Sequence, residues 1–194
     1  MIHHISGKLV SKTPTQVVIE AAGVGYLIHI SLNTYSRLPD QEHCMLFTHL
    51  SIKEDAHTLF GFAEEAERRL FVHLISVSGI GPNTGRMILS SITPQEIQDA
   101  IIRGDVSQMQ RIKGIGPKSA QRIILDLQDK LKKEGPDTLL SLMPNNTAKD
   151  EALSALIMLG FARNVAEKAL ENVIKAAGGD LPVEQLIKSA LKNL

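Results

Sequence analysis

The chain has 194 residues, 43% of them hydrophobic, and its 21 Lys and Arg residues balance 21 Asp and Glu residues. This length allows more than one globular domain. No stretch reaches the roughly 18 uncharged apolar residues of a membrane helix, and the N-terminus lacks a signal-peptide pattern, so we expect no membrane contact and a cytoplasmic location. The single cysteine, Cys44, excludes an intramolecular disulfide.

The first third of the chain has the pattern of short strands. Runs rich in β-branched and aromatic residues are separated by turn signals such as Thr13-Pro14 and Pro39-Asp40. Strands are expected at residues 2–10, 15–21, 26–32, 45–52 and 58–62, with a helical stretch at 33–38. Five strands with one helical interlude suit a small closed barrel of the OB type over residues 1–63. Its few aromatic and cationic residues favour a scaffold role over a base-stacking surface.

Six histidines lie in this first segment. None of their spacings matches a helical metal-ligand pair, and the alternation of a strand scatters them over both faces. We therefore expect no metal site, and histidines that lie at the surface or pack in the barrel. The six are His3, His4, His29, His43, His49 and His57.

The tetrapeptide Gly-Ile-Gly-Pro occurs twice, at residues 79–82 and 114–117, each time between stretches with helical periodicity. Its recurrence after 35 residues indicates a duplicated structural unit. The alignment of the two copies extends beyond the tetrapeptide, since Gly85 aligns with Ala120. Each copy resembles a helix-hairpin-helix, which grips a nucleic-acid backbone without reading its sequence.

Each residue of the turn has a physical reason to be there. Gly79 can adopt the positive φ that ends a helix, and Gly81 leaves room for a close ligand. Pro82 suits the first position of the next helix, whose free amides and positive dipole end attract an anion. Ile80 and Ile115 are expected to plug the core between the paired helices. The candidate DNA-binding residues are Gly79, Ile80, Gly81, Asn83, Thr84, Arg86, Gly114, Ile115, Gly116, Lys118, Ser119 and Arg122.

Other interpretations of these turns predict different proteins. A Walker A loop is excluded, because Pro117 separates Gly116 from Lys118 where Gly-Lys-Ser/Thr is required. A bend that binds nothing is disfavoured by the second copy and its cations. A nuclease or glycosylase would need clustered carboxylates or histidines, whereas Asp126 and Asp129 fit solvated helix positions, so we expect no catalytic site. A regulatory protein that binds partners through its C-terminal segment, and DNA only incidentally, stays open.

The basic excess of the chain is local. Residues 68–133 carry eleven Lys and Arg against five Asp and Glu, and this stretch contains both turns. A capping signal at Thr93 and Glu96 marks one helix start. A tandem helix-hairpin-helix domain is therefore predicted at residues 64–134. Its helices are expected at 65–77, 84–90, 94–103, 106–111 and 118–133.

Beyond residue 134 the pattern changes twice. Gly, Pro and Asn residues indicate a flexible linker over 135–147. Residues 148–194 predict a small module of three amphipathic helices. These are expected at 149–159, 162–176 and 183–192. Segment 155–161 resembles the turn with which UBA-like modules dock partners, and its apolar residues are either partner contacts or core.

A barrel, a duplicated helix-hairpin-helix, a linker and a three-helix module, in this order, resemble the RuvA family over the full chain. Local motifs agree, among them Gly23-Val24-Gly25-Tyr26, Phe47-Thr48-His49, Leu59-Phe60-Gly61-Phe62 and both Gly-Ile-Gly-Pro turns. The resemblance implies a non-catalytic subunit of the bacterial branch-migration machine, which binds four-way (Holliday) junction DNA in recombination and repair. It also implies a homotetramer, or an octamer of two tetramers, that holds the junction open and square-planar.

The same resemblance assigns roles to further residues. Glu54 and Asp55 match the acidic pin of the family, which projects at the crossover. The surface that recruits the hexameric ATPase RuvB would comprise Leu156, Leu159, Phe161 and Leu191. ATP and Mg²⁺ would be used by that motor, so this chain is expected to hold no cofactor. The junction resolvase RuvC is a further implied partner.

One position departs from the family pattern. Members often have Lys after the first Gly-x-Gly-Pro, where this chain has Asn83. The first hairpin must then rely on backbone amides and on Asn83, Thr84 and Arg86. We predict that the second hairpin contributes more of the salt-sensitive affinity, so Lys118→Ala should reduce the salt dependence of DNA binding more than Arg86→Ala.

Overall fold

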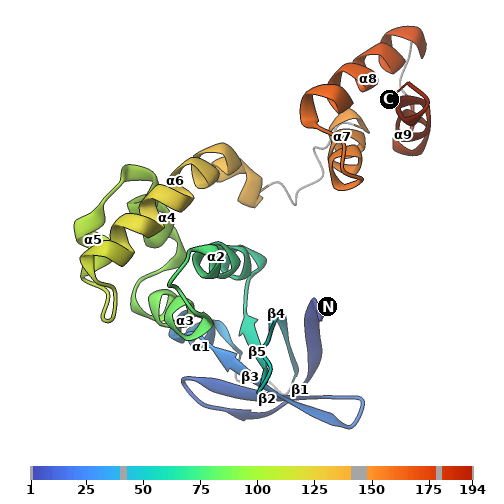
Figure 1. The fold of residues 1–194 in the computed structure, drawn as a ribbon. Coiled ribbons are helices and arrows are strands. Elements are labelled where there is room, and N and C mark those ends of the chain that lie inside the picture. The colour runs from blue at the N-terminus through green and yellow to red at the C-terminus, as the bar shows by residue number, and fades with distance from the viewer. Residues whose placement is uncertain (1, 40–42, 141–147, 178–180, 194) are drawn as a thin grey trace. The chain divides into compact units, whose positions relative to one another are not determined.

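The computed structural model describes residues 2–39, 43–140, 148–177 and 181–193, with side chains throughout except at 133–140 and 176–177. It comprises two compact units, Met1–Gly135 and Pro136–Leu194 (Figure 1). Within the described ranges, no helix combines the length and the hydrophobicity needed to cross a bilayer.

The first unit begins with a closed five-stranded barrel. Its strands are β1 (His4–Lys12), β2 (Gln16–Ala21), β3 (Val24–Ile30), β4 (His43–Ile52) and β5 (His57–Phe62). The closed order is β1-β2-β3-β5-β4, and all neighbours are antiparallel except β3 and β5. Helix α1 (Leu32–Arg37) joins β3 to β4. The predicted OB-type barrel is confirmed.

Alternate residues of the strands fill the barrel, as the period of a half-buried strand requires. Val17 and Ile19 of β2, and Ile28 and Ile30 of β3, are at most 1% exposed. The barrel is tight at Gly61, where a Cβ would lie 2.5 Å from the side chain of Ile28. Any larger residue at this point of β5 would push the strands apart.

Five helices follow the barrel, and the last of them runs past the end of the first unit at Gly135. They are α2 (Glu65–Ser76), α3 (Pro82–Ser91), α4 (Pro94–Arg103), α5 (Val106–Gln110) and α6 (Pro117–Leu140). The first four match the predicted ranges to within two residues, and the capping box of Thr93 and Glu96 is present at α4. One hydrophobic core extends from Phe60 and Phe62 of β5 into these helices. Barrel and helices therefore share a core rather than forming separate globules.

Helix α6 continues into the segment that was expected to be a linker. Its backbone is helical through Leu140, so residues 135–140 belong to the helix. The rest of the expected linker, 141–147, lies outside the described residues. The helix continues because Gly135 and Pro136 lower helix propensity only at their own positions, while the flanking Lys, Glu and Leu residues favour a helix.

The second unit is a three-helix module, as predicted. It consists of α7 (Ala148–Met158), α8 (Arg163–Ala177) and α9 (Val183–Leu191). Leu156, Leu170 and Leu186 contribute one core residue from each helix. Gly160, at φ 99°, ends α7 in the left-handed conformation, and the N–H of Phe161 donates to the carbonyl of Leu156 at 3.2 Å.

Candidate nucleic-acid interface

The two Gly-Ile-Gly-Pro bends are one structure built twice. In each, the isoleucine N–H donates to the carbonyl three residues earlier, at 3.0 Å for Ile80 and 3.1 Å for Ile115. The carbonyl of the second glycine accepts the first hydrogen bond of the next helix, at 2.9 Å for both Gly81 and Gly116. Both isoleucine side chains are 5% exposed, so they plug the core and do not face a ligand. The duplication is confirmed at the level of single hydrogen bonds.

The glycines have the conformations that the sequence predicts. Gly79 and Gly114 have φ values of 92° and 86°, where a side chain is disfavoured. A Cβ on Gly81 or Gly116 would meet no atom within 4 Å, and both residues are exposed. The second glycine of each bend therefore leaves the start of the next helix open to a close approach from solvent.

The starts of α3 and α6 have the features of an anion site. Gly81 caps α3 without a side-chain hydrogen bond, and Pro82 occupies the first position. Because Gly116 also lacks a side chain, neither cap residue satisfies the free amides of the first turn. Beside these amides lie the exposed Asn83 and Lys118 and the half-buried Thr84 and Ser119.

The two bends are connected by close packing and do not move independently of each other. The second bend contacts α3, because a Cβ on Gly114 would lie 2.7 Å from the Cε of Met87. Helix α3 in turn packs closely on α2, since a Cβ on Gly85 would lie 3.0 Å from the Ile75 side chain. The close-packed side chains thus set the spacing between the bends.

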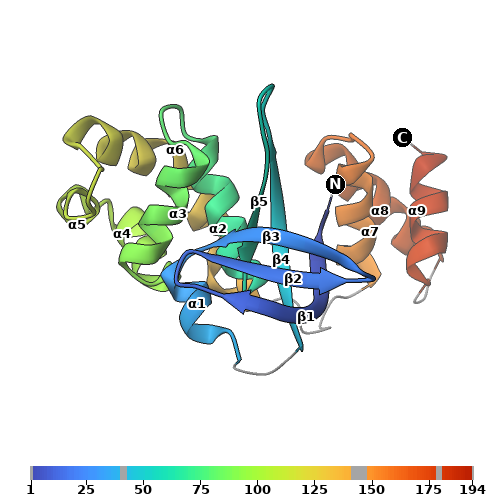
Figure 2. The same cartoon turned by 90° about the horizontal axis from the view of Figure 1, so that it is seen from below.

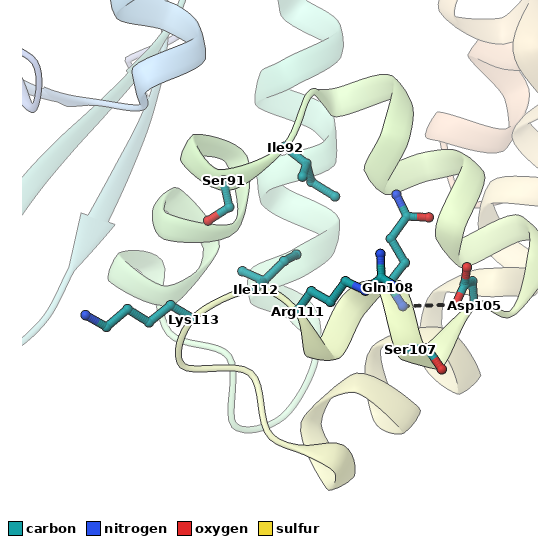
Figure 3. Close-up of a pocket in the computed structure, with 8 residues that line it drawn as sticks. All are labelled: Ser91, Ile92, Asp105, Ser107, Gln108, Arg111, Ile112 and Lys113. Atoms are coloured by element: carbon teal, nitrogen blue, oxygen red, sulfur yellow. Dashed lines mark hydrogen bonds between the residues drawn. The ribbon is translucent and has the colours of Figure 1, made fainter.

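A cavity of about 520 Å³ lies beside the second bend, between the end of α3 and α5 (Figure 3). Arg111 and Lys113 are among its lining residues, and both are exposed. Asp105 accepts from the N–H of Gln108 at 2.9 Å, so its carboxylate is engaged in capping α5. Arg111 and Lys113 were not among the predicted site residues, although two cations just before Gly114 could have indicated them.

Arg86 does not extend freely from the first hairpin. Its Nη1 donates to the carbonyl of Thr15 at 3.0 Å, and burial lowers the pKa of the guanidinium. Arg122, in contrast, is 57% exposed and lies 3.9 Å from Asp126, a surface pair that competes weakly with other partners. Arg86 as a DNA contact stays a prediction, and the structure gives its side chain a different partner.

The acidic residues lie at the tip of the β4–β5 hairpin, which projects beyond the other strands (Figure 2). The N–H of Lys53 donates to the carbonyl of Ala56 at 2.9 Å and closes the tip. Glu54 and Asp55 are both exposed there. Two carboxylates at the end of a projecting hairpin are compatible with the pin role, which stays a prediction.

The C-terminal module exposes apolar side chains at the end of α7, just after it, and on α9. Met158 is 89% exposed, Leu159 60% and Leu191 42%. Leu156 differs, because it is 0% exposed in the centre of the module, so its assignment as a partner contact is corrected to that of a core residue. Phe161 is half-buried against the same core. The exposure of Met158 was not predicted, because helical spacing alone does not distinguish the outer face of a short helix from the inner one.

The barrel histidines do not gather at a site. In the part of the chain that the structure describes, no three His, Cys, Asp or Glu side chains are arranged to hold a metal. His49 packs with its ring centroid 5.5 Å from that of Phe71. Burial, with a smaller effect of the Arg68 charge, lowers the pKa of His49.

Comparison with known proteins gives the same assignment for each part of the chain. Three family models match: "RuvA N terminal domain" at residues 1–61, "SAM-like Helix-hairpin-helix tandem" at 71–129 and "RuvA, C-terminal domain" at 147–194. The protein named Holliday junction branch migration complex subunit RuvA is 56% identical in Flavobacterium psychrophilum and 52% in Christiangramia forsetii, over 100% of both chains. Its counterpart in Bacteroides fragilis is 44% identical, again over 100% of both chains. Because these matches run through the barrel, the paired bends and the C-terminal module alike, the chain belongs to the RuvA family.

Proposed function

We propose that this chain binds four-way DNA junctions through their phosphates, without reading bases, as a non-catalytic subunit of a branch-migration complex. The observation that carries the proposal is the pair of exposed Gly-Ile-Gly-Pro bends, each opening onto the amides of a helix start. Such amides bind phosphate oxygens and carry no sequence information. Lys118 and Arg122 would add charge at the second bend. The names of the full-length relatives support the junction as the target.

The assembly that we propose is a homotetramer in which each chain holds one arm of the junction. A chain of net charge zero neutralises few phosphates, so useful affinity favours several chains on one DNA molecule. Glu54 and Asp55 of four chains would meet around the crossover. There their charges would repel phosphates, separate the strands and keep the junction open and square-planar.

We assign recruitment of the motor to the C-terminal module. The exposed apolar side chains of Met158, Leu159 and Leu191 would dock a hexameric ATPase of the RuvB type. That motor would hydrolyse ATP with the help of Mg²⁺, so the chain itself would need no cofactor. The complex would act in the cytoplasm.

A gel-shift titration tests the proposal. The protein should bind a four-way junction at least about tenfold more tightly than a linear duplex of equal length, at the same salt concentration. Light scattering of the complex should give four chains per junction, or eight. Cleavage of the DNA in Mg²⁺ would indicate a nuclease instead, and equal affinity for both DNAs would indicate incidental binding.

A further inference from the structure

Helix α3, which carries the amides of the first bend, is fastened to the barrel at two points. Arg86 Nη1 donates to the carbonyl of Thr15 at 3.0 Å, and Ser90 Oγ accepts from the N–H of Leu32 at 3.1 Å. Ser90 Oγ also donates to the carbonyl of Arg86 at 2.8 Å, one helical turn earlier. These four residues form what we call the α3–barrel seam.

The Thr15 carbonyl is a fixed acceptor rather than a mobile one. It also accepts the N–H of Ile30 at 3.0 Å, between the chain entering β2 and the end of β3. Arg86 lies so close to the barrel that its charge adds to burial, the larger cause, in lowering the pKa of His29. The position of α3 is therefore set against the barrel backbone.

Helix α2 is held to the barrel by different groups. Glu67 is 1% exposed and accepts from the hydroxyls of Ser31 and Thr34, the latter at 2.7 Å. The Phe71 ring packs against Phe60 and Phe62, with centroids 5.2 and 4.9 Å apart. Helix α2 is thus held on the barrel independently of the seam, whereas α3 packs on α2 at Gly85 and is fixed to the barrel backbone by the seam.

The seam controls a distance that matters for the proposed complex. The barrel carries the acidic tip at Glu54 and Asp55, whereas α3 carries the first phosphate-binding amides. Arg86 is four residues beyond Pro82, which is about 6 Å along the helix. A small rotation of α3 at the seam would therefore displace those amides relative to the tip.

We propose that Arg86 is a positioning residue, which anchors α3 on the Thr15 carbonyl, fixes the first bend relative to the acidic tip, and so favours four-way junctions over linear duplex without contacting phosphate. The inference rests on the proposed junction binding. It replaces the sequence-based assignment of Arg86 as a DNA contact. A guanidinium that binds phosphate must be able to turn toward it, whereas this one is half-buried and held in place by the bond from Nη1 to the Thr15 carbonyl.

The first test needs no DNA. Spin labels are placed at Asn83→Cys, in the first turn of α3, and at Ala56→Cys, in a Cys44→Ser background. Labelled chains are diluted with unlabelled ones so that distances within one chain are measured. The Arg86→Ala/Ser90→Ala double variant should broaden or shift the distance distribution. Arg86→Lys, which keeps a donor, should retain the distribution of the parent. An unchanged distribution in the double variant would overturn the proposal.

The second test separates anchoring from phosphate contact by salt titration. On linear duplex, Arg86→Ala should leave the slope of log affinity against log salt unchanged, whereas Lys118→Ala should lower it by about one. On the four-way junction, Arg86→Ala should lose about fivefold more affinity than on linear duplex, and Arg86→Lys should restore it. A slope loss for Arg86→Ala equal to that of Lys118→Ala would overturn the proposal.

Thermal unfolding of each variant serves as the folding control, and Ser90→Ala alone supplies the same comparison if Arg86→Ala does not fold. A parent protein that shows no junction preference would refute the proposed function. The spin-label distances would still decide whether Arg86 anchors α3, so the two failures are distinguishable.

Discussion

The two hairpins form the same bend, with matching hydrogen bonds of 3.0 and 3.1 Å, yet differ in what surrounds it. At equivalent positions, 35 residues apart, the first hairpin has Asn83 where the second has Lys118. It also has Arg86, bonded to the barrel, where the second has the exposed Gln121. One copy is thus tied to the scaffold, and the other presents free charge.

This difference shows how the two copies of a duplicated motif can take different roles in binding DNA. The amides of both helix starts act at short range and in fixed directions. The cations of the second hairpin act over a Debye length, about 10 Å at 0.1 M salt, and attract DNA before contact. The anchored first hairpin adds little long-range attraction, but it fixes the orientation of the bound arm relative to the acidic tip.

The largest expected effect is on folding stability, at the first glycine of each bend. Gly79→Ala should lower the free energy of unfolding by about 1–2 kcal/mol, because a Cβ is disfavoured at its φ of 92°. Gly114→Ala should cost a similar amount, because its φ is 86° and the atom nearest to the new Cβ, Met87 Cε at 2.7 Å, is the end of a flexible side chain that can move aside. Urea denaturation measures both losses. A much larger loss at Gly114, relieved by adding Met87→Ala, would mean that Met87 is held rigidly against the second bend.

The next effect concerns the second glycine of each bend, where the hairpins should behave alike. A Cβ at Gly81 or Gly116 meets no protein atom within 4 Å, so alanine should leave stability nearly unchanged. It should nonetheless lower DNA affinity by about tenfold, or about 1.4 kcal/mol, by blocking phosphate approach. Titration with labelled duplex measures this, with the neighbouring Ser78→Ala as a control. A loss at one glycine alone would mean that only one bend contacts DNA.

A smaller effect follows from moving charge into the first hairpin. Asn83→Lys should raise the slope of log affinity against log salt by about one, because the new ammonium lies beside the free amides of α3. Asn83→Gln is the neutral control and should leave the slope unchanged. If Asn83→Lys changes affinity without changing the slope, the first bend does not lie against phosphate.

The sequence was sufficient for features set by local physics. Turn residues and the alternation of apolar and polar residues predicted the barrel. The Gly-Ile-Gly-Pro tetrapeptide predicted both positive-φ glycines and the burial of Ile80 and Ile115. These follow from steric rules that act within a few residues. The helix boundaries were predicted for the same reason, except at α6, which continues past Gly135 because the flanking residues favour a helix.

Features that depend on distant parts of the chain were not predictable in this way. Arg86 looked like a phosphate ligand because its partner, Thr15, is 71 residues earlier. Leu156 looked like a surface contact because the inner face of a short helix is decided only when three helices pack. The burial of Glu67 could not be predicted for a related reason. In sequence it resembles any exposed acidic residue of a helix, and it is buried only because Ser31 and Thr34, more than 30 residues earlier, pack against it.

Glu67 of α2, in the first hairpin, yields the last prediction and the smallest expected effect. Burial raises the pKa of Glu67 above its ordinary value of 4.5, and the hydrogen bonds from Ser31 and Thr34 oppose this only in part. The folded state therefore binds the proton more readily than the unfolded state. The resulting stabilisation is fully present below pH 4.5 and is lost as the pH rises through the folded pKa.

Glu67→Gln removes this titration while keeping a hydrogen-bonding side chain of similar size. The free energy of unfolding of the parent, minus that of Glu67→Gln, should fall as the pH rises above 4.5 and then level off. Urea denaturation from pH 4.5 to 8 measures it, with Glu64→Gln, an exposed position just before α2, as the matched control. A difference that stays constant with pH would mean that folding does not raise the pKa of Glu67, because the hydrogen bonds from Ser31 and Thr34 then offset the whole effect of burial.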